Sequence, residues 1–338
     1  MPAAPPAPSP VERPGLAGLE AFPLVGVPQM LGDQAPIFGS PRAATGAGTN
    51  VVRLPWVRGY KMADNQSPLP LDRVFATFYF YDDINVGNAR TPGTTIRDVK
   101  VYREFFGFEK TFLDGRSSLG LRLPLNSISA RGVPGGTSTA LGDLTVFGKY
   151  ALLMDRERGV FSLGMAVTPP TGPAAFAGAA YTRARNPTYL QPFIGVLRPM
   201  GRWYVQGFSG INVPTDSRVV TMYYNDLGIG YYLHQARRDD ALVSAVVPSM
   251  EVHVNTPLNH RGGFSDVRDP GATIDSVNLT FGLSTVLRRR TVLSAGFVTP
   301  VTGPRPFDIE AIATLNLAFG APRPGRLPGT VPPPSLGN

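Results

Sequence analysis

Apolar and polar residues alternate along most of residues 73–319 with a period of two. The clearest stretch is 118–126, where Leu119, Leu121, Leu123 and Leu125 share one face and Ser118, Gly120, Arg122 and Pro124 share the other. Residues 307–319 repeat the pattern, with Leu315, Leu317 and Phe319 on the apolar face and Glu310 and Asn316 on the polar face. Successive side chains of a β-strand point to opposite sides of the sheet, so this period predicts strands with one polar and one apolar face.

The alternation predicts twelve strands, near residues 73–82, 98–113, 117–126, 142–153, 159–168, 188–198, 202–213, 219–233, 242–255, 275–287, 291–299 and 307–319. Connections after even-numbered strands are short and mostly basic, such as 114–116 and 288–290. Those after odd-numbered strands are often long and rich in Gly, Pro and Thr, such as 127–141 and 169–187. Short turns on one rim and longer loops on the other are typical of bacterial outer-membrane barrels. An even number of strands then places both termini on the short-turn, periplasmic side.

The expected fold class is all-β: a closed antiparallel transmembrane β-barrel of about twelve strands, with extended proline-rich segments at both ends. We expect an extended Pro/Ala/Gly-rich N-terminal segment (residues 1–70), the barrel (71–320) and a proline-rich C-terminal tail (321–338). Proline cannot donate to a β ladder, so neither terminal segment is expected to be a barrel strand. The sequence has no apolar run of 18 residues, the minimum for a transmembrane helix, but barrels span lipid with alternating strands instead.

Several odd-numbered strands end in related sequences that contain Pro and Thr. These are AVTPPTG at 166–172, INVPTD at 211–216, HVNTP at 253–257 and FVTPVTG at 297–303. Proline at these positions stops ladder donation where the chain leaves the membrane. The recurrence on one rim indicates a hairpin repeated around a closed sheet.

Residues 141–153 (LGDLTVFGKYALL), followed by a strand that ends in PPTG at 169–172, resemble the outer-membrane barrels grouped as phenol-degradation meta-pathway or putative transporter proteins. Residues 61–67 (KMADNQS) and 107–115 (GFEKTFLDG) resemble uncharacterised planctomycete-type outer-membrane proteins. The likeness covers roughly residues 57–320 and implies a membrane barrel. Its motifs mark strand ends and turns, and neither family has catalytic residues to carry over. The long proline-rich N-terminal segment departs from the transporter-like pattern, which argues against a simple open pore.

Composition narrows the expected partners. Charged residues make up 17 % of the chain, against about 25 % in soluble domains, which agrees with an outer surface in lipid. The absence of cysteine excludes disulfides and cysteine-based metal sites or nucleophiles. The net charge of +8 fits either solvated loops or attraction to anionic headgroups. The arginines are scattered over turns without a recognition motif, so no nucleic acid is expected as a partner.

Alternation also assigns a polar face to the barrel lumen. The residues expected to point inward are Arg103, Glu109, Arg122, Asp143, Lys149, Gln191, Gln206, Asp226, Glu251, His253, Asn278, Glu310 and Asn316. The residues expected to face lipid are Leu119, Leu121, Leu123, Leu125, Leu315, Leu317 and Phe319. Arg or Lys facing lipid at mid-membrane would cost about 2–4 kcal/mol, which favours this register. The lumen groups either select solutes in a polar channel or, as Glu109, Arg122, Asp143 and Lys149 could, pair with one another and help to plug it.

The sequence does not predict catalysis. His253 shares a strand face with Glu251 and Asn255, and Ser249 is close in sequence, which invites comparison with outer-membrane phospholipases. The sequence context of their His, Ser and Asn motifs is missing. Glu251 and His253 supply two metal ligands at best, so a hydrogen-bonded lumen histidine is the simpler interpretation. No catalytic residue, metal site or cofactor is therefore expected.

The terminal segments leave two interpretations open. Residues 1–70 are either a disordered periplasmic linker or a docking arm that lays Phe22, Leu24 or Trp56 into the barrel mouth or a partner's groove. The start, MPAAPPAPSPVERPG, lacks the basic residues and apolar stretch of a signal peptide, so we expect a processed form or a different start. Expected partners are membrane lipid and, through residues 1–70 and 321–338, other envelope proteins or sister copies.

Two functions follow for a barrel in the bacterial outer membrane with periplasmic termini. The first is a channel or transporter-like barrel for the passive passage of small solutes, with residues 1–70 as a plug or gate. The second is a non-conducting structural or assembly barrel that anchors an envelope complex through its proline-rich tails.

Overall fold

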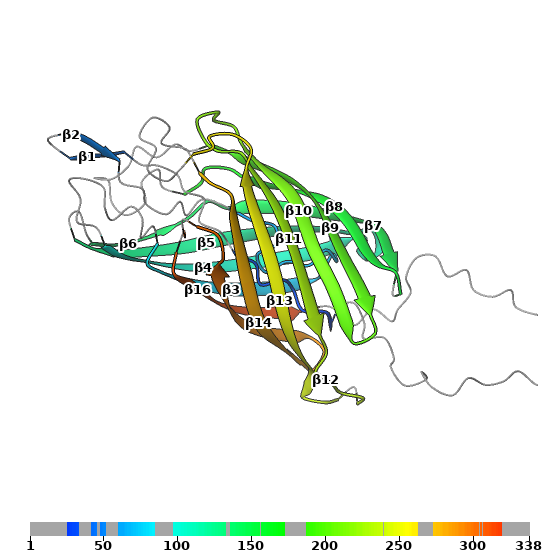
Figure 1. The fold of residues 1–338 in the computed structure, drawn as a ribbon. Coiled ribbons are helices and arrows are strands. Elements are labelled where there is room, and N and C mark those ends of the chain that lie inside the picture. Colours follow the sequence, from blue (N-terminus) through cyan, green and yellow to red (C-terminus); the bar gives the residue numbers. More distant parts are fainter. Residues whose placement is uncertain are drawn as a thin grey trace, which may run out of the picture.

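The computed structural model describes residues 26–33, 42–45, 48–51, 60–84, 97–132, 136–155, 157–172, 187–238, 240–262, 273–303, 305 and 307–319. Twelve strands in this part of the chain form one closed antiparallel ring (Figure 1). In chain order they are β3 (Arg73–Asp82), β4 (Arg97–Phe112), β5 (Ser117–Arg131), β7 (Thr145–Asp155), β8 (Gly159–Thr168), β9 (Tyr189–Met200), β10 (Trp203–Pro214), β11 (Met222–Tyr231), β13 (Val243–Pro257), β14 (Ser276–Leu287), β15 (Thr291–Pro300) and β16 (Ile309–Ala318). Each overlaps one of the twelve predicted ranges, and the predicted fold class is confirmed.

The first and last strands of the ring close it. Strand β16 pairs with β3 over its whole length, from Ile309 opposite Asp82 to Ala318 opposite Arg73. Each ring strand otherwise pairs with its sequence neighbours, so every connection is a hairpin. The described residues contain no helix that is long and apolar enough to cross a membrane.

Two short strands extend hairpins beyond the ring. Strand β6 (Gly136–Leu141) pairs with the far end of β5, within a range that the sequence predicted to be a loop. Ser127 and Thr139 face each other there, and their hydroxyl oxygens lie 2.8 Å apart. Such Ser- and Thr-rich strands lack apolar contrast between their faces, so a period-two hydrophobic pattern cannot reveal them. Strand β12 (His234–Gln235) extends the opposite, short-turn rim by pairing with β13.

The two faces of the ring differ as the alternation predicts. Every ring strand exposes at least one large apolar side chain on the outside, for example Val74, Phe106, Leu119, Leu152, Leu163, Ile194, Trp203, Leu227, Met250, Leu283, Phe297 and Leu317. The inner face carries buried charged and polar side chains, such as Arg122 and Glu251, together with buried apolar and aromatic ones, such as Phe147 and Phe193. A soluble protein would not expose this much apolar surface, because such surface is normally confined to small patches.

Two pieces of the N-terminal segment fill the ring. Residues 26–33 (the first lumen segment) and 60–71 (the second lumen segment) are buried throughout. A separate two-stranded sheet lies between them in sequence and consists of β1 (Arg42–Thr45) and β2 (Gly48–Val51). Phe22, Leu24, Trp56 and the C-terminal tail 321–338 lie outside the described residues.

Candidate functional site

The ammonium group of Lys61 lies at the centre of the lumen's charge network. Its Nζ lies 2.5 Å from Asp33 Oδ1 and 2.6 Å from Asp226 Oδ1, and it donates a hydrogen bond to Asn255 Oδ1 at 2.8 Å. Asp33 and Lys61 belong to the two lumen segments, whereas Asp226 and Asn255 belong to strands β11 and β13 of the wall. One buried cation therefore joins both lumen segments to the barrel.

This ion pair is withdrawn from solvent. The side chains of Lys61, Asp33 and Asp226 are 3 %, 0 % and 1 % exposed. A buried charge is costly unless it is paired, so the close contact of the ammonium with both carboxylates offsets their loss of hydration.

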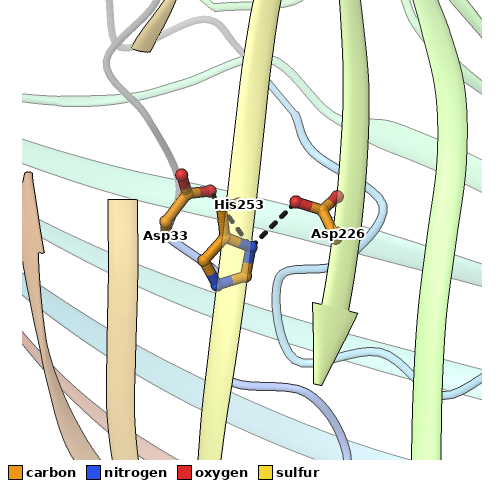
Figure 2. A group of neighbouring side chains, drawn as sticks. All are labelled: Asp33, Asp226 and His253. Atoms are coloured by element: carbon orange, nitrogen blue, oxygen red, sulfur yellow. Dashed lines mark hydrogen bonds and ion pairs between the residues drawn. The ribbon is translucent and has the colours of Figure 1, made fainter. Parts of the chain in front are cut away.

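His253 lies between Asp33 and Asp226 (Figure 2), and both of its ring nitrogens have a hydrogen-bond partner. Its Nδ1 lies 2.8 Å from Asp226 Oδ1, and its Nε2 lies 3.0 Å from Thr280 Oγ1. Ligand atoms of Asp33, Asp226 and His253 lie within 4.8 Å of one another, a spacing that could hold a metal ion. The Lys61 ammonium already contacts both carboxylates, so a cation is supplied by the chain itself.

Glu251 fixes the backbone of the first lumen segment. Its two carboxylate oxygens accept hydrogen bonds from Leu31 N at 2.8 Å and Gly32 N at 3.0 Å. The backbone of Gly32 has φ +83°, and an added Cβ would overlap Asp64 Oδ1 and lie 2.8 Å from Asp64 Cα. Only glycine fits where the two lumen segments approach this closely.

A second charge cluster holds the end of the second lumen segment. Glu109 lies 2.7 Å from Lys149 Nζ and 3.0 Å from Arg73 Nε, and it also accepts hydrogen bonds from Ser118 Oγ and Leu71 N. The Lys149 ammonium in turn donates to the carbonyl oxygen of Ser67 at 2.9 Å. Wall charges are thus neutralised partly by one another and partly by the lumen segment.

Arg122 contacts the second lumen segment by charge and by ring stacking. Its Nη2 lies 3.8 Å from Asp64 Oδ2, and its guanidinium lies over the rings of Tyr60 at 4.4 Å and Phe105 at 3.7 Å. The Arg122 and Asp64 side chains are both buried, with 2 % and 0 % exposed. The guanidinium fits this place because it offers both donors and a flat face to aromatic rings.

Side-chain amides of the wall bind the lumen segments at further points. The contacts are Gln191 Nε2 to Tyr60 O (3.0 Å), Gln206 Nε2 to Pro28 O (3.0 Å), Asn278 Nδ2 to Asp33 Oδ2 (2.8 Å) and Asn316 Nδ2 to Asn65 Oδ1 (2.8 Å). They come from strands β9, β10, β14 and β16. The lumen segments are therefore held from several sides of the ring.

Glycines of the wall make room for a lumen side chain. An added Cβ at Gly282 of β14 would overlap Leu31 Cδ1, and one at Gly296 of β15 would lie 2.7 Å from the same atom. Leu31 thus occupies a hollow that exists because these two neighbouring residues lack side chains.

All thirteen residues expected to line the lumen are buried. Ten of them take part in the contacts above, and the other three are Arg103, Asp143 and Glu310. Arg103 donates to Asn126 Oδ1 at 3.0 Å, and Glu310 lies opposite Tyr81 in the β3–β16 ladder. Asp143 precedes β7 and accepts a hydrogen bond from Gly172 N at 2.7 Å, which joins two loops at the rim. Of the four residues expected to pair across the lumen, Glu109 and Lys149 are in contact at 2.7 Å.

The residues expected to face lipid are exposed or half-exposed. Leu119, Leu121 and Leu317 are exposed, and Leu123, Leu125, Leu315 and Phe319 are half-buried. Their contact with lipid stays a prediction.

Sequence reasoning missed the partners that the N-terminal segment supplies. Asp33, Lys61 and Asp64 were not among the predicted lumen residues. The available signal was the run KMADNQS at 61–67, a compact polar stretch within a proline-rich segment. The pattern of polar and apolar residues in this run does not reveal which wall residues it contacts.

Ser249 is not placed to act as a nucleophile with His253. Neither ring nitrogen of His253 contacts Ser249, which lies four residues away on the same strand. Four residues of extended chain span about 13 Å. A nucleophile and its base must lie within hydrogen-bond reach, so these two residues cannot act as such a pair.

Neither a protein-family model nor a curated protein sequence matches this chain. Solved structures that resemble it are outer-membrane β-barrels. An outer membrane channel from Pseudomonas putida F1 has 14 % identity and a TM-score of 0.49, covering 74 % of this chain and 97 % of its own. The NanC porin has 9 % identity and a TM-score of 0.43, covering 73 % and 100 %. Outer membrane phospholipase A from Escherichia coli has 13 % identity and a TM-score of 0.38, covering 74 % and 97 %. Similarity at this level concerns the fold, and function must be argued from the site itself.

Proposed function

We propose that this chain is an outer-membrane channel for small polar solutes, closed by its own N-terminal segment. The observation that carries the proposal is the chemistry of the lumen. The wall bears buried charged and amide side chains whose partners come from the lumen segments, as Asp226 and Glu251 illustrate. A wall of this kind can be solvated when the lumen segments move aside, whereas an apolar core could not.

Membrane placement is argued from the outer surface. Exposed apolar side chains on all twelve ring strands form a belt, which suits hydrocarbon and is unfavourable in water. Short turns such as 114–116 lie on one rim, and the strand ends joined by longer connections, such as Asp82 of β3 and Arg97 of β4, lie on the other. By analogy with barrels in general, the short-turn rim is the periplasmic one.

The second candidate function is a non-conducting anchor for an envelope complex. It is favoured by the way the lumen segments are held, since Lys61 takes part in two buried ion pairs and Glu251 accepts two backbone hydrogen bonds from the first lumen segment. In this case the barrel is permanently filled, and its role is to hold the terminal segments at the membrane.

Single-channel currents in planar bilayers separate the two functions, and the absence of native cysteine allows a reversible lock. The lock is a disulfide between Leu31→Cys and Gly282→Cys. A Cβ at residue 282 would overlap the position of Leu31 Cδ1. The sulfur of Cys at residue 31 would lie one bond length from that position, so the two cysteines would be close enough to be joined. The lock is placed in a Lys61→Met background, which weakens the contact of both lumen segments with the wall. Under the channel proposal the oxidised variant is silent and the reduced variant conducts.

The matched control carries Leu31→Cys and Lys61→Met without the second cysteine, and its currents should not depend on reductant. Deletion of residues 1–70 provides an independent test, because it should raise conductance if these residues close the lumen. Silence of the reduced variant and of the folded deletion variant would exclude the channel and favour the anchor.

A further inference from the structure

The first lumen segment runs from the short-turn rim toward the loop rim. Its Pro28 carbonyl accepts a hydrogen bond from Gln206, which lies near the short-turn end of β10. Its Asp33 carboxylate accepts one from Asn255, which lies near the loop end of β13. Residues 26–33 therefore traverse the middle of the barrel in one direction.

The second lumen segment runs the opposite way. The Tyr60 carbonyl accepts a hydrogen bond from Gln191, near the loop end of β9. Leu71 N donates to Glu109, near the short-turn end of β4, and the chain then enters β3 at the same rim. Residues 60–71 thus return through the lumen that residues 26–33 have already crossed.

The two segments contact each other between these ends. Met30 N donates to the carbonyl oxygen of Gln66 at 2.9 Å, and Lys61 pairs with Asp33 at 2.5 Å. The close approach of Gly32 to Asp64 adds a third contact. The chain therefore crosses the barrel twice, as a pair of antiparallel segments with polar contacts to each other and to the wall.

This route carries the intervening residues to the loop rim. Asp33 and Tyr60 both lie toward that rim, and hairpin β1–β2 comes between them in sequence. Figure 1 shows β1 and β2 beyond the loop-side ends of the ring strands, on the side of β6 and far from β12.

We propose that the barrel has a second role as a conduit that displays its own hairpin β1–β2 on the outer face of the membrane. This proposal rests on the membrane placement argued above but not on conduction. The lumen segments 26–33 and 60–71, which flank the hairpin in sequence, are both buried in the barrel, so the displayed segment is held on both sides at the face opposite to the start of the ring. A filled, non-conducting barrel serves this role as well as a gated one.

Single cysteines in the otherwise cysteine-free full chain test the proposal with a membrane-impermeant maleimide on intact cells. The test variant is Thr45→Cys, at the end of β1. Two matched controls report the sides of the membrane. Arg131→Cys replaces a side chain 78 % exposed at the loop end of β5, and Arg238→Cys replaces one 80 % exposed at the short-turn rim.

We expect Thr45→Cys and Arg131→Cys to be labelled to the same extent in intact cells, and Arg238→Cys to be labelled only after the membrane is permeabilised. If Arg131→Cys is labelled and Thr45→Cys is protected like Arg238→Cys, display is excluded while membrane placement stands. Equal labelling of all three variants in intact cells would contradict the proposed placement of the barrel in the membrane. Heat-modifiable gel migration of each variant verifies that the barrel has folded.

Discussion

Lys61 shows how this lumen accommodates buried charge. Its ammonium has carboxylate partners on both a lumen segment and the wall, at 2.5 and 2.6 Å. A buried ion pair stabilises the folded state little more than an apolar contact would, but removing one partner leaves an uncompensated buried charge. Removing Lys61 should therefore lower the stability of the barrel, and the loss can be measured.

Lys61→Met should lower the free energy of unfolding by about 3–5 kcal/mol, because Asp33 and Asp226 then lose their cation. Unfolding in guanidinium, followed by gel migration, measures the change. Adding Asp226→Asn should restore part of the loss, since it removes one of the stranded charges. The control Lys100→Gln disrupts a solvent-exposed pair with Asp82 and should have little effect. Equal effects of the two lysine substitutions would contradict the proposed role of Lys61.

Gly32→Ala tests the close approach of the lumen segments. The substitution places a Cβ against Asp64 at a residue with φ +83°, which should cost about 1 kcal/mol or more and loosen residues 26–33. Trypsin cleavage after the buried Lys61 should then become detectable in the folded barrel. Gly201→Ala is the matched control, because its φ is +65° but nothing lies within 4 Å of the added Cβ. Protection of Lys61 in both variants would mean that the contact does not secure the lumen segments.

At the scale of strands, the period-two pattern carried most of the information. It located all twelve ring strands, and for β3 and β8 the predicted ranges coincide with the observed bounds. It failed where apolar contrast was absent, as in the Ser- and Thr-rich hairpin of β5 and β6. The same pattern separated buried residues from exposed ones, because face alternation is a local property of extended backbone.

Leu121→Arg tests whether the outward face of β5 meets lipid. Leu121 is 45 % exposed in the part of β5 that pairs with β7, and Arg facing the membrane interior should cost up to about 2–4 kcal/mol. Folding yield into lipid vesicles and resistance to denaturant both report this cost. Leu113→Arg is the control, since Leu113 is 68 % exposed in the adjoining turn. If the barrel were soluble, neither substitution would matter, because surface changes in water are nearly neutral.

At the scale of the whole molecule, closure of the ring removes the free edges that an open sheet would expose. The decisive ladder is β16 with β3, which joins residues more than two hundred positions apart in the chain. The lumen segments add polar contacts to the wall at several levels along the barrel axis. A closed barrel of this kind should therefore stay compact in detergent until it is heated.

Ala313→Pro should abolish the compact, fast-migrating form in unheated detergent gels. Ala313 lies in β16 between Phe78 of β3 and Ala295 of β15. Proline at this residue has no backbone N–H to donate to the neighbouring strand, and it is rarely tolerated in a strand that is paired on both sides. Ala313→Val is the matched control, because this outward side chain is exposed and valine suits a strand. Heat-modifiable migration that survives the proline would contradict closure through β16.

The sequence by itself determined the fold class, the number of strands and the two faces of the sheet, because each depends on neighbours one or two residues apart. It also indicated which rim has the short turns. Only the tertiary structure decided which charges meet and how the N-terminal segment passes through the barrel. Asp33 meets Asp226 and Asn278 only once the ring has closed around it, and contacts at such separations leave no period in the chain. The proline-rich N-terminal segment has no alternation from which its path could be predicted. Its place in the lumen depends on specific contacts with side chains of the wall.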